Sequence, residues 1–144
     1  MRARFDRGQI RERELWIKGH DLHSTRRFLQ DGAEEVGLHG RSRDHAVQAA
    51  SEAIANAIEH GCTCLEGDVH VRITGEGGLA VFYVSDCGTF RNEAALAMEM
   101  PDPMAERGRG LPLIAAVMDE VDVLREPGRT TIRMGKRRRT LSVV

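Results

Sequence analysis

Residues 43–60 are predicted to form an amphipathic helix, and this helix constrains the fold more than any other feature of the sequence. At about 100° per residue, its apolar residues gather into the single arc that a core-facing helix needs. They are Ala46, Val47, Ala50, Ala53, Ile54, Ala57 and Ile58. The opposite face carries polar residues, namely His45, Gln48, Glu52, Asn56 and Glu59. Because residues four apart stack along a helix, the side-chain oxygens of Glu52 and Asn56 can converge on one ligand, although such a pair is more often part of a solvated helix face.

The remaining hydrophobic patterns predict a single α+β domain. Strands are predicted over residues 14–19, 69–74, 79–85, 121–125 and 130–135, and helices over 23–38 and 111–120. Residues 87–110 are irregular, and long loops of this kind are usually functional or disordered. Helices interspersed with hairpins predict a two-layer sandwich, in which helices cover one face of a mixed, mostly antiparallel sheet.

Both ends of the chain are basic. Residues 1–13 contain five arginines, and residues 136–139 are all lysine or arginine. The formal net charge is only -1, and Phe5 is the one aromatic residue in the two basic runs, so base stacking has little to work with. We therefore expect no direct nucleic-acid binding and two solvated ends. The expected organisation is a charged segment over residues 1–13, one domain over 14–137 and a basic, flexible tail over 138–144.

Hydropathy and cysteine usage predict a cytoplasmic protein that does not enter a membrane. No apolar run approaches the roughly 18 residues of a membrane span, and the arginine-rich start lacks the apolar segment of a signal peptide. Three cysteines give no disulfide framework. Cys62 and Cys64 have C-x-C spacing without a second ligand pair, so buried thiols are preferred to a metal site.

Two further motifs combine with the polar face of the predicted helix at 43–60. Asp86 and Gly88 follow a strand, where the turn would direct a carboxylate out of the sheet edge. Residues 108–111 open a helix, whose free N–H groups and positive dipole end suit a phosphate. Each motif alone is weak. Together with Glu52 and Asn56, they supply the metal ligand, the purine-reading carboxylate and the phosphate loop of a nucleotide site, without a P-loop or Rossmann glycine pattern.

These motifs resemble those of the GHKL ATP-binding superfamily, which is shared by gyrase-type ATPases and sensor histidine kinases. Within it, the chain is most similar to the anti-sigma factor serine/threonine kinases. Residues 52–61 resemble the N box, 86–88 the G1 box, 107–111 with 118–121 the G2 box and its helix, and 128–134 the closing strand. The resemblance covers about residues 14–137 and implies the histidine-kinase-like, or Bergerat, ATPase fold.

For the phosphate side of the site, the resemblance implies that Asn56 holds Mg²⁺ and that Glu52 is the general base or orients the attacking hydroxyl. The phosphates would be bound by Gly108, Arg109, Gly110 and Leu111.

For the adenine side, the resemblance implies that Asp86 accepts a hydrogen bond from the adenine amino group and that Gly88 lets the ring approach the backbone. Thr130 would lie near the adenine, directly or through water, and residues 89–107 would form a lid. A second glycine of the G1 box is missing, because Phe90 follows Thr89, and Arg129 stands where a glycine is common. A structural role for His60 at the helix end is preferred to a catalytic one.

The function implied is an ATP- and Mg²⁺-dependent anti-sigma factor kinase in transcription regulation and stress response. It would sequester a sigma factor and phosphorylate an anti-anti-sigma antagonist protein on serine or threonine. Relatives are commonly homodimers. The alternatives are a regulatory ATP-binding module without phosphate transfer, within a larger phosphatase-kinase regulator, and an unrelated α+β domain that binds no ATP.

Overall fold

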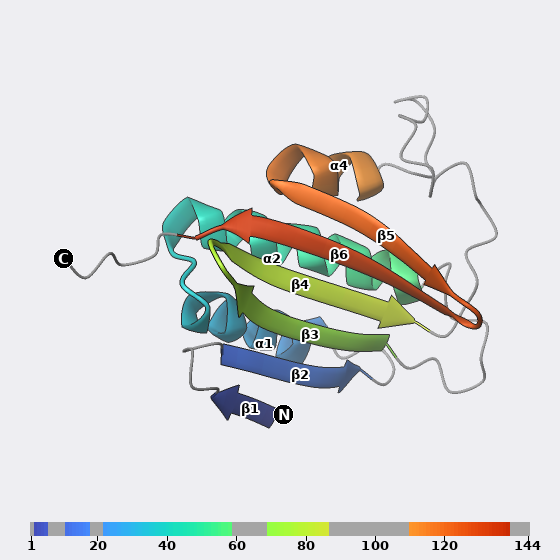
Figure 1. Ribbon diagram of the computed structural model, residues 1–144, viewed down its shortest axis with the longest axis horizontal. Coiled ribbons are helices and arrows are strands. Elements are labelled where there is room, and N and C mark those ends of the chain that lie inside the picture. Colours follow the sequence, from blue (N-terminus) through green and yellow to red (C-terminus); the bar gives the residue numbers. More distant parts are fainter. Residues whose placement is uncertain (1, 6–10, 18–21, 59–68, 87–109, 139–144) are drawn as a thin grey trace.

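The computed structural model describes residues 2–5, 11–17, 22–58, 69–86 and 110–138. Its strands form one sheet in the order β1-β2-β3-β4-β6-β5 (Figure 1). The strands are β1 (Arg2–Phe5), β2 (Arg11–Ile17), β3 (Val69–Glu76), β4 (Leu79–Asp86), β5 (Glu120–Glu126) and β6 (Arg129–Arg137). Every neighbouring pair among these strands is antiparallel.

The helices cover one face of this sheet (Figure 1). They are α1 (Leu22–Glu35), α2 (Gly40–Asn56) and α4 (Gly110–Val117). The predicted α+β class, with helices on one face of the sheet, is confirmed. In the part of the chain that the structure describes, no helix combines the length and the apolar character needed to cross a membrane.

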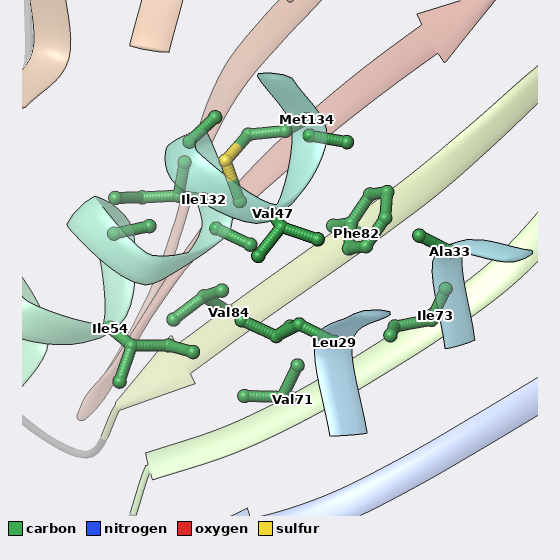
Figure 2. Packing of buried hydrophobic residues seen from close by; sticks show 14 of the residues in the cluster. Leu29, Ala33, Val47, Ile54, Val71, Ile73, Phe82, Val84, Ile132 and Met134 are labelled. Carbon is green, nitrogen blue, oxygen red and sulfur yellow. The ribbon is translucent and has the colours of Figure 1, made fainter. Parts of the chain in front are cut away.

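The core lies between the helices and the inner face of the sheet (Figure 2). Strand β3 contributes alternate residues to it, Val69, Val71 and Ile73, as the period-two pattern predicts. The predicted α2 stripe is buried from Ala46 to Ala57, with Ile58 packed against it. Ala49 is also buried, because α2 contacts α1 on one side and α4 on the other as well as the sheet.

The N-terminal half of the sheet begins earlier than the sequence predicts. Strand β2 starts at Arg11 rather than at residue 14, and β1 adds an edge strand that the pattern does not predict. Both segments are rich in charged residues, so no apolar alternation marks them. Charged residues are compatible with an edge, where they also discourage pairing with other chains.

The basic residues at the end of β6 are held by carbonyl groups. Lys136 Nζ donates to the carbonyl oxygen of Val117, at the C-terminus of α4, where the helix dipole favours a cation. The Arg138 guanidinium donates to Gly77 O at 2.7 and 3.0 Å and to Val36 O at 3.1 Å. Lys136 and Arg138 are therefore not the solvated residues that the sequence analysis predicts.

Candidate functional site

Helix α2 places Glu52 and Asn56 one turn apart near its C-terminal end, and both residues are half-buried. The helical backbone continues past them, because the Ala57 N–H donates to Ala53 O and Ile54 O. Both positions are therefore fixed by regular helical geometry, and the intervening residues Ala53 and Ile54 are buried in the core. Among the described residues of the predicted polar face, His45 is also half-buried, and Gln48 is exposed.

Strands β4 and β6 place Asp86 beside Thr130. The two residues are direct cross-strand partners, and their side chains are only 5% and 3% exposed. They share the inner face with Val69, the partner of Asp86 on β3. Two buried polar side chains thus lie next to the apolar row of Val84 and Ile132, and a buried polar group is costly unless it is matched by a hydrogen-bonding group.

The helix and sheet halves of the site lie at the same side of the molecule. The C-terminal end of α2, the end of β4 and the start of β6 are on one side of the ribbon (Figure 1). Figure 2 shows Ile54 and Val84 in one apolar layer of the core. Asn56 and Asp86 each follow one of these two residues by two positions. Both predicted nucleotide residues therefore lie two positions after a core residue.

A side-chain hydrogen bond reinforces this edge from the other face of the sheet. The hydroxyl oxygens of Ser85 and Thr131 are 2.7 Å apart, and these residues are also direct partners across β4 and β6. The bond ties together the residues adjacent to Asp86 and Thr130. Sequence reasoning missed this pair because its signal is the strand register, which the local pattern does not reveal.

Helix α4 begins at Gly110 and includes Leu111. These two residues of the predicted phosphate loop therefore lie at a helix N-terminus. The first backbone N–H groups of a helix lack intrahelical partners and can bind an anion. Helix α4 contacts α2 and β5. It ends at Val117, three residues before the predicted boundary, because the Asp119 N–H donates to Gly135 O and leads the chain into β5.

Several predicted residues lie outside the described residues. They are Glu59, His60, Cys62, Cys64, Cys87, Gly88, Gly108, Arg109 and the predicted lid at 89–107. Within the described ranges, no group of three or more His, Cys, Asp or Glu residues could hold a metal ion. The Mg²⁺ site predicted at Asn56 would be of a different kind, in which most of the ligands come from phosphates and water.

The outer face of the sheet carries a charged cluster behind the site. Tyr83 donates to the Glu76 carboxylate at 2.6 Å, and the Arg72 guanidinium lies 4.3 Å from the centre of the tyrosine ring. Burial, followed by the hydrogen bond to Glu76, raises the pKa of Tyr83. Arg133 donates to Glu120 and Asp122. This cluster joins four strands, and it shares no side chain with the candidate site.

Comparison with known proteins agrees with the fold. Residues 16–136 match the family described as "Histidine kinase-like ATPase domain". No curated protein matches the chain. The solved structure of the RsbU and RsbW domains of Rv1364c from Mycobacterium tuberculosis is similar in fold, with a TM-score of 0.62 and 22% sequence identity. The match covers 87% of this chain and 32% of the other, so the chain spans about a third of that protein's length.

The family match covers most of the chain, including both α2 and the β4–β6 edge. The superfamily resemblance predicted from the N box and the glycine motifs is therefore confirmed. The chain belongs to the histidine kinase-like ATPase domain family.

Proposed function

We propose that this protein is an ATP- and Mg²⁺-dependent serine/threonine kinase that acts as an anti-sigma factor. It would sequester a sigma factor and phosphorylate an anti-anti-sigma antagonist protein on a serine or threonine hydroxyl. The observation that carries the proposal is the placement of Glu52 and Asn56 at the end of α2 that lies on the same side as the buried Asp86–Thr130 pair. Family membership and similarity in fold to a structure that contains an RsbW domain support it.

The buried pair suits the base of the nucleotide. An ionised carboxylate only accepts hydrogen bonds, whereas an amino group donates them. Asp86 would therefore accept a hydrogen bond from the adenine amino group, at a position where 95% of its surface is already removed from water. The neighbouring Thr130 hydroxyl can both donate and accept, so it can pair with a ring nitrogen or with a bridging water.

The α2 residues suit the phosphates and the transfer step. The Asn56 carboxamide oxygen is a hard ligand of the kind that Mg²⁺ prefers alongside phosphate oxygens. When bound, Mg²⁺ neutralises the charge that develops on the phosphates. Glu52, one turn earlier, would orient the partner's hydroxyl and accept its proton. The N-terminus of α4, together with residues 108–111, would bind the phosphate oxygens.

Other parts of the proposal come from the resemblance to the anti-sigma kinases. They are a homodimeric state, a cytoplasmic location and control of a stress-response sigma factor. The similar solved structure is about three times as long as the matched segment, because the match covers only 32% of it. An ATP-binding module inside a larger phosphatase-kinase regulator is therefore the second function to be tested.

The test is phosphate transfer from labelled ATP to candidate antagonist proteins, with three variants. Glu52→Ala should abolish transfer and leave ATP affinity nearly unchanged. Gln48→Ala is the matched control, because Gln48 is exposed on the same helix face one turn earlier. Asp86→Asn should lose ATP affinity. Tight ATP binding by the wild type without transfer to any antagonist would favour the binding module, and failure to bind ATP with Mg²⁺ would refute both functions.

A further inference from the structure

Arg125 lies in the same cross-strand row as the two buried polar residues of the site. Strand register pairs Asp86 of β4 with Thr130 of β6, and Thr130 with Arg125 of β5. Adjacent strands are about 4.8 Å apart, so the Cα atom of Arg125 lies roughly 10 Å from that of Asp86. Direct partners in a sheet project from the same face, so Arg125 is on the inner face with Asp86 and Thr130.

Charge is rare on this face of the four strands. The next inner row consists of Val71, Val84, Ile132 and Val123. In the described parts of β3, β4, β5 and β6, the charged residues that share the inner face are Asp86, Arg125 and Lys136. Lys136 meets the C-terminal carbonyl group of α4 at the far end of the sheet. Among the charged residues of these described strands, Arg125 is the cation at the end of the inner face where Asp86 is located.

The row also opens toward solvent in the direction of Arg125. Asp86 and Thr130 are buried, whereas Arg125, on the edge strand, is exposed. A ligand held by the buried pair would therefore have Arg125 at the exposed end of its row. Arg125 shares its row with Asp86 and Thr130, the residues proposed to bind the base, whereas Asn56 on α2 and Gly110 at the start of α4 belong to the helix layer.

We propose that Arg125 stacks its guanidinium group on the purine ring of the bound nucleotide and so acts as a further nucleotide-binding residue. This inference rests on the proposed function, because it assumes that Asp86 reads adenine. A planar guanidinium stacks on aromatic rings better than an ammonium group does. Stacking would cover the open side of a base whose amino edge faces Asp86.

The experiment measures the affinities of the full chain for ATP with Mg²⁺ and for adenosine, which lacks phosphates. Arg125→Ala should weaken both affinities by a similar factor of about 2- to 30-fold, the range for one cation–π contact. Arg125→Lys keeps the charge without the planar group and should recover only part of the affinity. Arg129→Ala is the matched control, because Arg129 is an exposed arginine on the same hairpin that pairs with Glu126 on the outer face.

Each outcome decides between the inference and its alternatives. Equal affinities for wild type and Arg125→Ala, or equal losses in Arg125→Ala and Arg129→Ala, would overturn the inference and leave the proposed function intact. A loss for ATP without a loss for adenosine would assign Arg125 to the phosphates and overturn stacking. If the wild type binds neither compound, the proposed function itself fails. Thermal unfolding of each variant checks that the fold is retained.

Discussion

Arg138 connects three separate parts of the chain, so Arg138→Ala is expected to destabilise the whole domain. Its guanidinium donates two hydrogen bonds to Gly77 O in the β3–β4 turn and one to Val36 O after α1. The side chain also passes over Gly75, where an added Cβ would collide with the guanidinium. The substitution removes all three side-chain bonds and leaves the Val36 carbonyl group partly buried.

The magnitude follows from the number and exposure of these bonds. A hydrogen bond to a charged group contributes about 1.5–3 kcal/mol when it is buried, and exposed bonds contribute much less. Only the bond to Val36 is part-buried, and the two to Gly77 are exposed. We therefore expect Arg138→Ala to lower the free energy of unfolding by about 2 kcal/mol, which lowers the Tm of a domain of this size by about 4–8 °C.

Thermal unfolding followed by circular dichroism measures this loss, and Arg137→Ala is the control. Arg137 is also basic and adjacent, but its bond to Asp119 at 2.7 Å is made by the backbone N–H, which alanine keeps. Arg137→Ala should therefore change the Tm little. Equal Tm values for Arg138→Ala and the wild type would show that the Arg138 contacts contribute nothing, and that this end of the chain is solvated after all.

Three further predictions test other parts of the structure. Asp86→Asn should weaken ATP binding by about 10- to 100-fold in calorimetric titration, because it replaces an acceptor-only group facing the adenine amino group; unchanged affinity would remove Asp86 from the site. The raised pKa of Tyr83 means that its stabilising contribution is complete below about pH 10 and is lost as the pH rises through the folded-state pKa. Between pH 9 and 11, the free energy of unfolding measured with urea should therefore fall less for Tyr83→Phe than for the wild type. Absorbance follows the titration of Tyr83, the only tyrosine in the sequence. Parallel curves of unfolding free energy against pH would contradict the raised pKa. Gly77→Ala should lower the free energy of unfolding by about 1–2 kcal/mol, because Gly77 has a φ of 61°. Gly78 has an open Cβ position and no positive φ, so Gly78→Ala should lower it much less. Equal losses in the two variants would refute the backbone explanation.

The sequence predicts the parts of the fold that depend on local periodicity. The α2 stripe, the β3–β4 hairpin and the β5–β6 hairpin all follow from apolar spacing, and the structure has each of them. The pattern fails where charge dominates, as in β1 and the start of β2, because pairing at a sheet edge requires no apolar alternation. It also fails for Arg138, whose carbonyl partners lie far away in the sequence.

The same difference between local and long-range information applies to the candidate site. The one-turn spacing of Glu52 and Asn56 is a local property of a helix, so the sequence predicts it directly. The adjacency of Asp86 and Thr130 depends on the pairing of β4 with β6, which are separated in the chain by α4 and β5. Resemblance to a family linked these residues, whereas the physical pattern alone did not. The proposed contribution of Arg125 is further from local prediction still, since its face is defined only by the register of three strands.

The two halves of the proposed site are built on different elements, and Glu52, the residue proposed for transfer, is not part of the sheet half that is proposed to bind the base. Asp86 and Thr130 are fixed by the β4–β6 ladder, whereas Glu52 and Asn56 are fixed by α2. The halves are joined through the core, where Ile54 precedes Asn56 and Val84 precedes Asp86 (Figure 2). Removing Glu52 leaves the sheet half untouched, so a protein that still binds ATP tightly can lose all transfer. ATP binding therefore provides no evidence for the kinase, and only the behaviour of Glu52 variants distinguishes an enzyme from a binding module.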